Sequence, residues 1–558
     1  MSFRTLLTQF VKAVAEELAD GSFGEQAGGA VAWLEEHPES TLDLLELLVK
    51  EASRKKPKPE LLEACFFLLG QGLEFLRYRM ESGRKDGEAL VLELQEHLVL
   101  QAPHLPSLVI LRILQEFTRA KLLIVEALRQ QFTEMLDEQL EEVAHAPHFS
   151  GIAEDEAFKS IYREMGCDPF AFQAQIVEQT DPFPTRYRAV LAASFLGMDE
   201  PGLREAALGW LLDRDGEVRH FVTQALEQAS GQGRMTSTLL RRMIAMRNWL
   251  PEKDRPALDA AIRTARLKGI DCAPWPEAVV VSVHVSGEDG AGAQSLFVVG
   301  KEGRQFCFGA LLLKRGFGVR DAWVRHDLTR QDIRDLLGQI GGQTELFKTS
   351  ADYMRLLIGQ NLAQGARENS LPPFALLEFA EAAGLPDLRP AFLETADVLE
   401  ALHPAAELQA ETEPAPAMSE KQVCAVLRRC GSEEKGPSFL AYWFEDDPEV
   451  GKVLGRRVIA LEKAAEAVRD RLLQPRREAW ADKVAWAALM LKHAGKPKWA
   501  ADFALVAREL LGERPCCDFL MLDLIALRTV MSHLHQRRSG RGRLSAGGEK
   551  TSQRKKTS

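Results

Sequence analysis

Apolar side chains recur at three- and four-residue spacing through most of this chain, but one stretch breaks that rhythm. In the runs LLTQFVKAVAEEL and STLDLLELLVKEA, the apolar residues fall on one face of a helix, as helix packing requires. From Val279 to Val324, apolar and polar residues alternate instead, and glycine is dense. Alternation with a period of two indicates β-strands. The sequence therefore predicts a mainly α-helical protein with one small α+β module near its middle.

The α+β module is predicted to contain three or four strands and one helix. The odd-numbered valines from Val279 to Val285 would share one face of the first strand. QSLFVVG, RQFCFGALLLK and RDAWVRHDL are typical of further strands, and LTRQDIRDLLGQI is typical of a helix capped by Thr329. The loop GEDGAGAQS lacks the lysine of a phosphate-binding loop and precedes a strand, so we interpret it as a hairpin loop with positive φ.

One short segment resembles a known helical-repeat family. The residues Asp215-Gly216-Glu217-Val218-Arg219 lie between two short predicted helices and look like the D-x-x-V-R turn of HEAT-type repeats. The resemblance covers roughly residues 185–265. It implies that the aspartate caps the second helix, the valine enters the core and the arginine packs along the ladder of stacked helix pairs. The expected fold class is thus a HEAT-like α-solenoid or helical array that carries the α+β module.

Composition and proline-rich breaks divide the chain into seven predicted segments. They are an N-terminal helical region (1–150), HEAT-like repeats (151–272), the α+β module (273–342), a helical region (343–403), a linker (404–420), a C-terminal helical unit (421–535) and a basic disordered tail (536–558).

The formal charge is unevenly spread along the chain. Of the total −11, the tail from Gln536 contributes +7 (eight basic residues and one acid), which leaves −18 for residues 1–535. An acidic body repels a polyanion, whereas a basic arm attracts one. Nucleic acid is therefore a candidate partner only through residues 536–558 and local basic patches.

Hydropathy and the distribution of cysteines indicate where in the cell the protein is expected to be located. No run of about 18 apolar residues is present, so no membrane span or membrane partner is expected. The start of the chain is interpreted as an amphipathic helix rather than a secretory signal. The eight cysteines are scattered through helical sequence, unlike the disulfide framework of a small secreted protein. We expect reduced thiols and a cytoplasmic location, while the oligomeric state stays open.

The segment KRGFGVRDAW is the first candidate partner-binding site. Lys314, Arg315 and Arg320 surround the aromatic Phe317 on a glycine-hinged turn. Basic and aromatic side chains in this arrangement could stack on a nucleic-acid strand or grip a peptide. The alternative is that Phe317 and Trp323 fill the core of the sheet and the charges are solvated.

A second candidate is the arginine-rich helix GRMTSTLLRRMIAMRNWL. Arg241 and Arg242 lie on it, with Arg234 and Arg247 nearby. Helical repeats that bind nucleic acid line a groove with such residues, and a solvated helix face is the alternative.

Catalytic chemistry would have to reside in the α+β module. Its histidines and nearby carboxylates could form a metal or acid–base site if they converged: His284, Asp289, Asp321, His326 and Asp327. Their spacing does not require convergence, and no metalloprotease, zinc or nucleophile-elbow motif is present. We therefore assign no catalytic, cofactor-binding or metal-binding residue, and we expect no cofactor.

Three functions remain in view. The favoured one is a non-enzymatic interaction or scaffold protein that binds protein partners through a helical-repeat surface and the α+β module. The first alternative is a nucleic-acid-associated factor that uses the basic tail and the arginine-rich helix. The second alternative is an enzyme with its site in the α+β module.

Overall fold

The protein is described here from a computed structural model that covers residues 3–19, 24–82, 84–144, 151–402, 418–432, 436–447, 449–455 and 460–535. The predicted basic tail and residues 404–417 of the predicted linker lie outside the described residues. The chain forms two compact units. Of the described residues, the first unit comprises those within 1–161, 175–188 and 532–535, and the second comprises those within 162–174 and 189–531.

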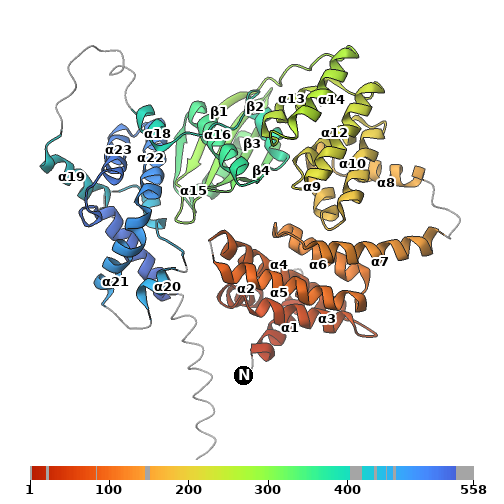
Figure 1. Ribbon diagram of the computed structural model, residues 1–558, viewed down its shortest axis with the longest axis horizontal. Coiled ribbons are helices and arrows are strands. Elements are labelled where there is room, and N and C mark those ends of the chain that lie inside the picture. Colours follow the sequence, from red (N-terminus) through yellow and green to blue (C-terminus); the bar gives the residue numbers. More distant parts are fainter. Residues whose placement is uncertain are drawn as a thin grey trace, which may run out of the picture. The chain divides into compact units, whose positions relative to one another are not determined.

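The described chain is mainly α-helical with one small antiparallel sheet (Figure 1). The helices before the sheet are α1 (Phe3–Ala19), α2 (Glu25–Glu36), α3 (Ser40–Ala52), α4 (Pro59–Glu81), α5 (Lys85–Gln101), α6 (Ser107–Arg119), α7 (Glu126–Ala144), α8 (Gly151–Glu164), α9 (Pro169–Thr180), α10 (Thr185–Gly197), α11 (Pro201–Ala207), α12 (Gly216–Gly231), α13 (Ser237–Met246) and α14 (Arg255–Leu267).

The sheet and the elements that follow it complete the second unit. They are β1 (Val279–Ser286), β2 (Ala293–Glu302), β3 (Gln305–Lys314), β4 (Gly318–Leu328), α15 (Arg330–Gly341), β5 (Leu346–Thr349), α16 (Ala351–Arg367), α17 (Ala375–Ala382), α18 (Thr395–Ala401), α19 (Glu420–Cys430), α20 (Glu449–Leu454), α21 (Leu461–Val468), α22 (Arg477–His493), α23 (Pro497–Leu511) and a further helical segment from 520. Within the described ranges, no helix combines the length and apolarity that a bilayer crossing needs.

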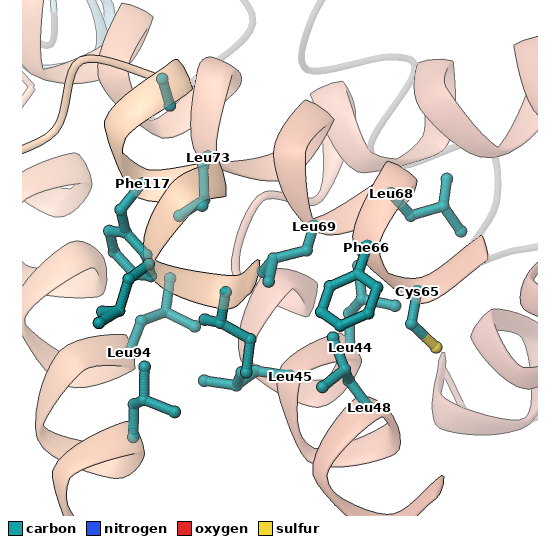
Figure 2. Packing of buried hydrophobic residues seen from close by; sticks show 14 of the residues in the cluster. Leu44, Leu45, Leu48, Cys65, Phe66, Leu68, Leu69, Leu73, Leu94 and Phe117 are labelled. Atoms are coloured by element: carbon teal, nitrogen blue, oxygen red, sulfur yellow. The ribbon is translucent and has the colours of Figure 1, made fainter. Parts of the chain in front are cut away.

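The first unit is held together by a helical core that Figure 2 shows from close by. Leu44 and Leu48 of α3 lie against Phe66 and Leu69 of α4, and all four side chains are buried. These residues recur at three- and four-residue spacing, which places them on one face of each helix. The helical pattern read from the sequence is confirmed here.

The turn before α12 has the local geometry that the HEAT resemblance implies. The Asp215 carboxylate caps α12 by accepting a hydrogen bond of 2.9 Å from the Glu217 amide. Val218 is fully buried. The Arg219 guanidinium donates to the Asp254 carboxylate at 2.7 Å, directly before α14, and so links α12 to the start of α14. A repeat array across residues 151–272 stays a prediction, because a single turn does not define a period.

The sheet has five antiparallel strands in the order β4-β3-β2-β1-β5. The first four strands follow each other as hairpins, as the alternating sequence predicts. After α15 the chain returns to add β5 beside β1. The sequence did not reveal β5, because four residues are too few to show alternation.

Helices cover both faces of this sheet. On one face, Ile333 of α15 packs against Phe297, Phe308 and Ala310. On the other face, Gly309 lets Phe379 of α17 approach, since an added Cβ would lie 2.8 Å from its ring. A sheet with apolar residues on both faces needs such cover to remove them from water.

The first strand departs from the predicted alternation. A β-bulge between Val280 and Ser282 shifts the register of β1 against β2. As a result Val283 and Val285 are buried, whereas Val279 and Val281 are exposed. The prediction of a single valine face over Val279–Val285 is therefore wrong for its first half.

Candidate functional site

Two hairpin loops of the sheet meet the C-terminal helices in a partly buried cluster of charges. Glu288, after β1, forms a two-point ion pair with Arg315, after β3, with N–O distances of 2.8 and 2.7 Å. Arg315 also donates to Asp482 of α22. Lys483 of α22 lies 3.5 Å from Glu288 and donates to the Asp289 carbonyl. We call Glu288, Arg315, Asp482 and Lys483 the junction cluster.

Aromatic rings and close backbone contacts seal the junction cluster. The Lys483 ammonium lies 5.3 Å from the ring centre of Trp443 and 5.2 Å from that of Trp480. Trp443 donates its indole N–H to the Glu288 carbonyl at 2.7 Å. Gly290 donates its amide to the Tyr442 carbonyl at 2.8 Å, and a Cβ there would lie 2.7 Å from the same oxygen. The glycine-rich loop thus serves close packing.

Burial and neighbouring charges shift the pKa values of the cluster. Burial alone would raise the pKa of Glu288, but the positive charges of Arg315 and Lys483 lower it below its usual value. Burial lowers the pKa of Lys483, and the Glu288 carboxylate only partly offsets this. The cluster contains two acids and two bases, so its formal charge is zero. The cluster can stabilise the fold or bind a neutral ligand, but it has no excess positive charge with which to attract a polyanion.

A small pocket lies beside the junction cluster, and we call it the amide pocket. Its lining residues come from the hairpin loops, β2, β3, α16 and α22: Glu288, Gly292, Gln294, Leu313, Arg315, Leu357, Gln360, Asn361, Gln364 and Trp486. The pocket is partly open to solvent, and its volume of about 20 Å³ is enough for one water molecule or the tip of a ligand. Trp486 is only 5% exposed, and its indole N–H has no hydrogen-bond partner in the described part of the chain.

Part of the sheet next to β4 is left uncovered, and we call it the β4 face: Leu312, Trp323 and Arg325. Leu312 is 42% exposed and Trp323 is 37% exposed. The cross-strand pairs Leu312–Asp321 and Ala310–Trp323 place both side chains on the face that α15 covers elsewhere. The Arg325 guanidinium lies 5.3 Å from the centre of the Trp323 ring.

The structure separates the candidate residues of the KRGFG turn. Lys314 is buried, and Arg315 belongs to the junction cluster. Phe317 is half-buried, and the Arg320 guanidinium lies 5.6 Å from its ring centre. Phe317 and Arg320 are thus both partly exposed and contact each other.

The arginines of the arginine-rich helix form ion pairs with carboxylates of the same chain. Arg242 donates two hydrogen bonds of 2.9 Å to Glu381 and one of 2.9 Å to Glu205. Arg241 donates to the same Glu381 carboxylate at 2.7 Å, and Arg247 pairs with Asp259. These ion pairs join α13 to α11 and α17. A role for Arg241 and Arg242 in binding a partner stays a prediction that would require these pairs to open.

The residues considered for catalysis come from different parts of the sheet: Asp289 lies in the loop after β1, and Asp321 and Asp327 lie on β4. His284 lies on β1 and contacts the Ser282 hydroxyl at 3.0 Å, whereas His326 lies on β4 and contacts Glu378 at 3.0 Å. Three strand spacings, roughly 14 Å, separate β1 from β4. Asp289 accepts the Ala293 amide within its own loop. The described residues contain no group of three metal-ligand side chains. The two histidines therefore do not share one site, and an enzyme with its site in the α+β module stays an alternative hypothesis.

Sequence reasoning missed Glu288, Asp482, Lys483 and Trp486. Arg315 and Asp482 are 167 residues apart, and no local pattern connects them. The tryptophan-rich helix around Trp480 and Trp486 was the one available signal, because a buried indole needs a partner for its N–H.

Comparisons with known proteins cover much of the second unit. A family model described as the Y4lR second domain matches residues 184–269, and one described as the Y4lR C-terminal helical domain matches residues 397–534. Uncharacterized protein y4lR of Sinorhizobium fredii (strain NBRC 101917 / NGR234) is 26% identical over 371 residues, which cover 65% of this chain and 69% of that protein. No solved structure matches. In the sequence, the strands of the sheet fall between the segments that the two family models match.

Proposed function

We propose that this chain is a non-enzymatic interaction protein whose β4 face binds an extended segment of a protein partner. The observation that carries the proposal is the exposed Trp323, stacked with Arg325 and adjacent to exposed Leu312, on an eleven-residue strand at the edge of the sheet. Tryptophan and arginine are enriched where protein interfaces concentrate their binding energy. An edge strand also accepts an added strand through its main chain.

A protein partner fits the charges better than a nucleic acid. The junction cluster neutralises Arg315, and the ion pairs of α13 engage Arg241 and Arg242. Residues 1–535 carry a formal charge of −18. The alternative is a nucleic-acid-associated factor that binds through the basic tail and the arginine-rich helix, and such binding would weaken steeply with added salt.

The finer features belong to the same proposal. The capping and ion-pair geometry of Asp215 and Arg219 supports a HEAT-like array in residues 151–272 as a second binding surface. The cysteines are scattered through the sequence rather than spaced as the disulfide framework of a small secreted protein, which supports a cytoplasmic location.

Affinity purification from the cell that makes the protein, followed by reconstitution, tests the β4 face. The full chain and its Trp323→Ala and Leu511→Ala variants serve as baits, because Leu511 is similarly exposed at the end of α23, away from the sheet. We expect a protein that binds wild type and Leu511→Ala. In purified form, its affinity for Trp323→Ala should fall by roughly thirtyfold or more.

Three outcomes contradict the proposal. The first is binding that Trp323→Ala leaves unchanged, with circular dichroism confirming that the variant is folded. The second is loss of every captured protein after nuclease treatment, which would favour the nucleic-acid alternative. The third is a captured protein that fails to bind when purified.

A further inference from the structure

The strongest observation outside the β4 face is an unsatisfied hydrogen-bond donor in the amide pocket. Trp486 is 95% buried, yet its indole N–H has no partner among the described residues. The large majority of buried polar groups in native proteins are paired, because an unpaired one loses its bond to water. A donor of this kind on the wall of a pocket points to an occupant that supplies an acceptor.

Two side chains of α16 add complementary groups to the same pocket. The Gln364 side-chain oxygen accepts the Gly316 amide at 3.1 Å, and its amide nitrogen bonds to no group in the described ranges. Asn361 donates to the Leu357 carbonyl at 2.9 Å, and its side-chain oxygen is likewise unused within those ranges. The pocket thus offers donors from Trp486 and Gln364 and an acceptor from Asn361.

Charge and size narrow the chemistry of the occupant. Glu288 and Arg315 both line the pocket and neutralise each other through their two-point ion pair. A carboxylate ligand would meet the Glu288 carboxylate, and a cation would meet Arg315, so a net charge is disfavoured. The volume of about 20 Å³ admits the end of a ligand, and the rest of a larger ligand would extend through the open side of the pocket.

We propose that the amide pocket binds a neutral carboxamide group. Its carbonyl oxygen accepts from the Trp486 indole N–H and the Gln364 amide, and its N–H donates to the Asn361 side-chain oxygen. The carboxamide belongs either to a free small molecule or to a glutamine or asparagine side chain of a bound polypeptide. This site is separate from the β4 face and does not depend on the function proposed above.

Indole resonances of the full chain, labelled with ¹⁵N-tryptophan, test this site directly. The chain has nine tryptophans, and Trp486→Phe identifies the Trp486 signal by its disappearance. Acetamide and N-acetylglutamine amide are the two probes, and sodium acetate is the charged control. We expect saturable movement of the Trp486 signal with the amides and none with acetate. Tighter binding of the glutamine probe assigns the carboxamide to a polypeptide, and equal binding assigns it to a small molecule.

A matched pair of variants separates the pocket from its surroundings. Gln364→Leu should weaken acetamide binding roughly fivefold, because one hydrogen bond is lost. Gln343→Leu changes an exposed glutamine just after α15 and should leave the binding unchanged. A Trp486 signal that ignores both amides, or that moves equally with acetate, would overturn the proposal and leave a bound water as the partner of the indole.

Discussion

At the residue scale, most of the arginines that stand out in the sequence form ion pairs with carboxylates of the same chain. Arg242 is only 7% exposed and contacts two carboxylates, and Arg315 binds two others. A cluster of arginines in a sequence does not reveal whether acids elsewhere in the chain will meet it. By contrast, Asp215 and Thr329 were correctly identified as helix caps, because capping depends on neighbours within a few residues.

Glu288 makes stability depend on pH in the acid range. Its pKa is lower in the folded protein than the usual 4.5, because Arg315 and Lys483 outweigh the effect of burial. As the pH falls below about 4.5, the unfolded chain takes up the proton first, so folding loses stability. We expect the urea midpoint of the second unit to fall between neutral pH and about pH 4, and to fall less in Glu288→Gln.

The exposed Glu368 provides the control for this pH dependence. It lies just after α16 in the same unit, and Glu368→Gln removes a carboxylate without touching the junction cluster. Glu368→Gln should keep the wild-type dependence on pH. Equal slopes for wild type and Glu288→Gln would show that the junction cluster does not contribute.

At the element scale, regular sequence patterns predicted the strands and helices themselves better than the way these elements pack against one another. The strands β2, β3 and β4 follow from alternation over ten or more residues, and α15 follows from its cap and periodicity. The bulge in β1 and the incomplete cover by α15 depend on tertiary packing and leave no such pattern. The exposure of Trp323 therefore could not be predicted from sequence alone.

Replacing two glycines of the sheet region with alanine should change the stability of the protein in opposite directions. Gly318, at the start of β4, has φ of +88°, and an added Cβ would lie 2.8 Å from the Asn361 carbonyl of α16. Gly338 lies inside α15 and an added Cβ there meets nothing within 4 Å. Gly318→Ala should lower the free energy of unfolding by about 1–3 kcal/mol or more. Gly338→Ala should raise the free energy of unfolding by about 0.5–1 kcal/mol.

Urea denaturation followed by circular dichroism checks this pair. The two midpoints should move to opposite sides of the wild-type value. Stabilisation by Gly318→Ala would contradict the close approach of β4 to α16, and destabilisation by Gly338→Ala would contradict the open surroundings of α15.

At the scale of the whole molecule, the sequence predicted the class of fold but not the tertiary contacts between segments that are far apart in the chain. The mainly helical architecture and the central sheet follow from two different periodicities in one chain. The junction cluster and the amide pocket join residues near 290, 315, 360 and 485, so no local window contains them. The candidate site could accordingly be foreseen only as far as Arg315 and the turn that carries it.

Hydrogen exchange on the purified complex tests most directly whether the β4 face is where the partner binds. An added strand would bond to the outer edge of β4 and bury Trp323, so amide exchange in residues 318–328 should slow when the partner binds. The Leu511→Ala variant should show the same protection. Slower exchange confined to other segments, with β4 unchanged, would contradict the account.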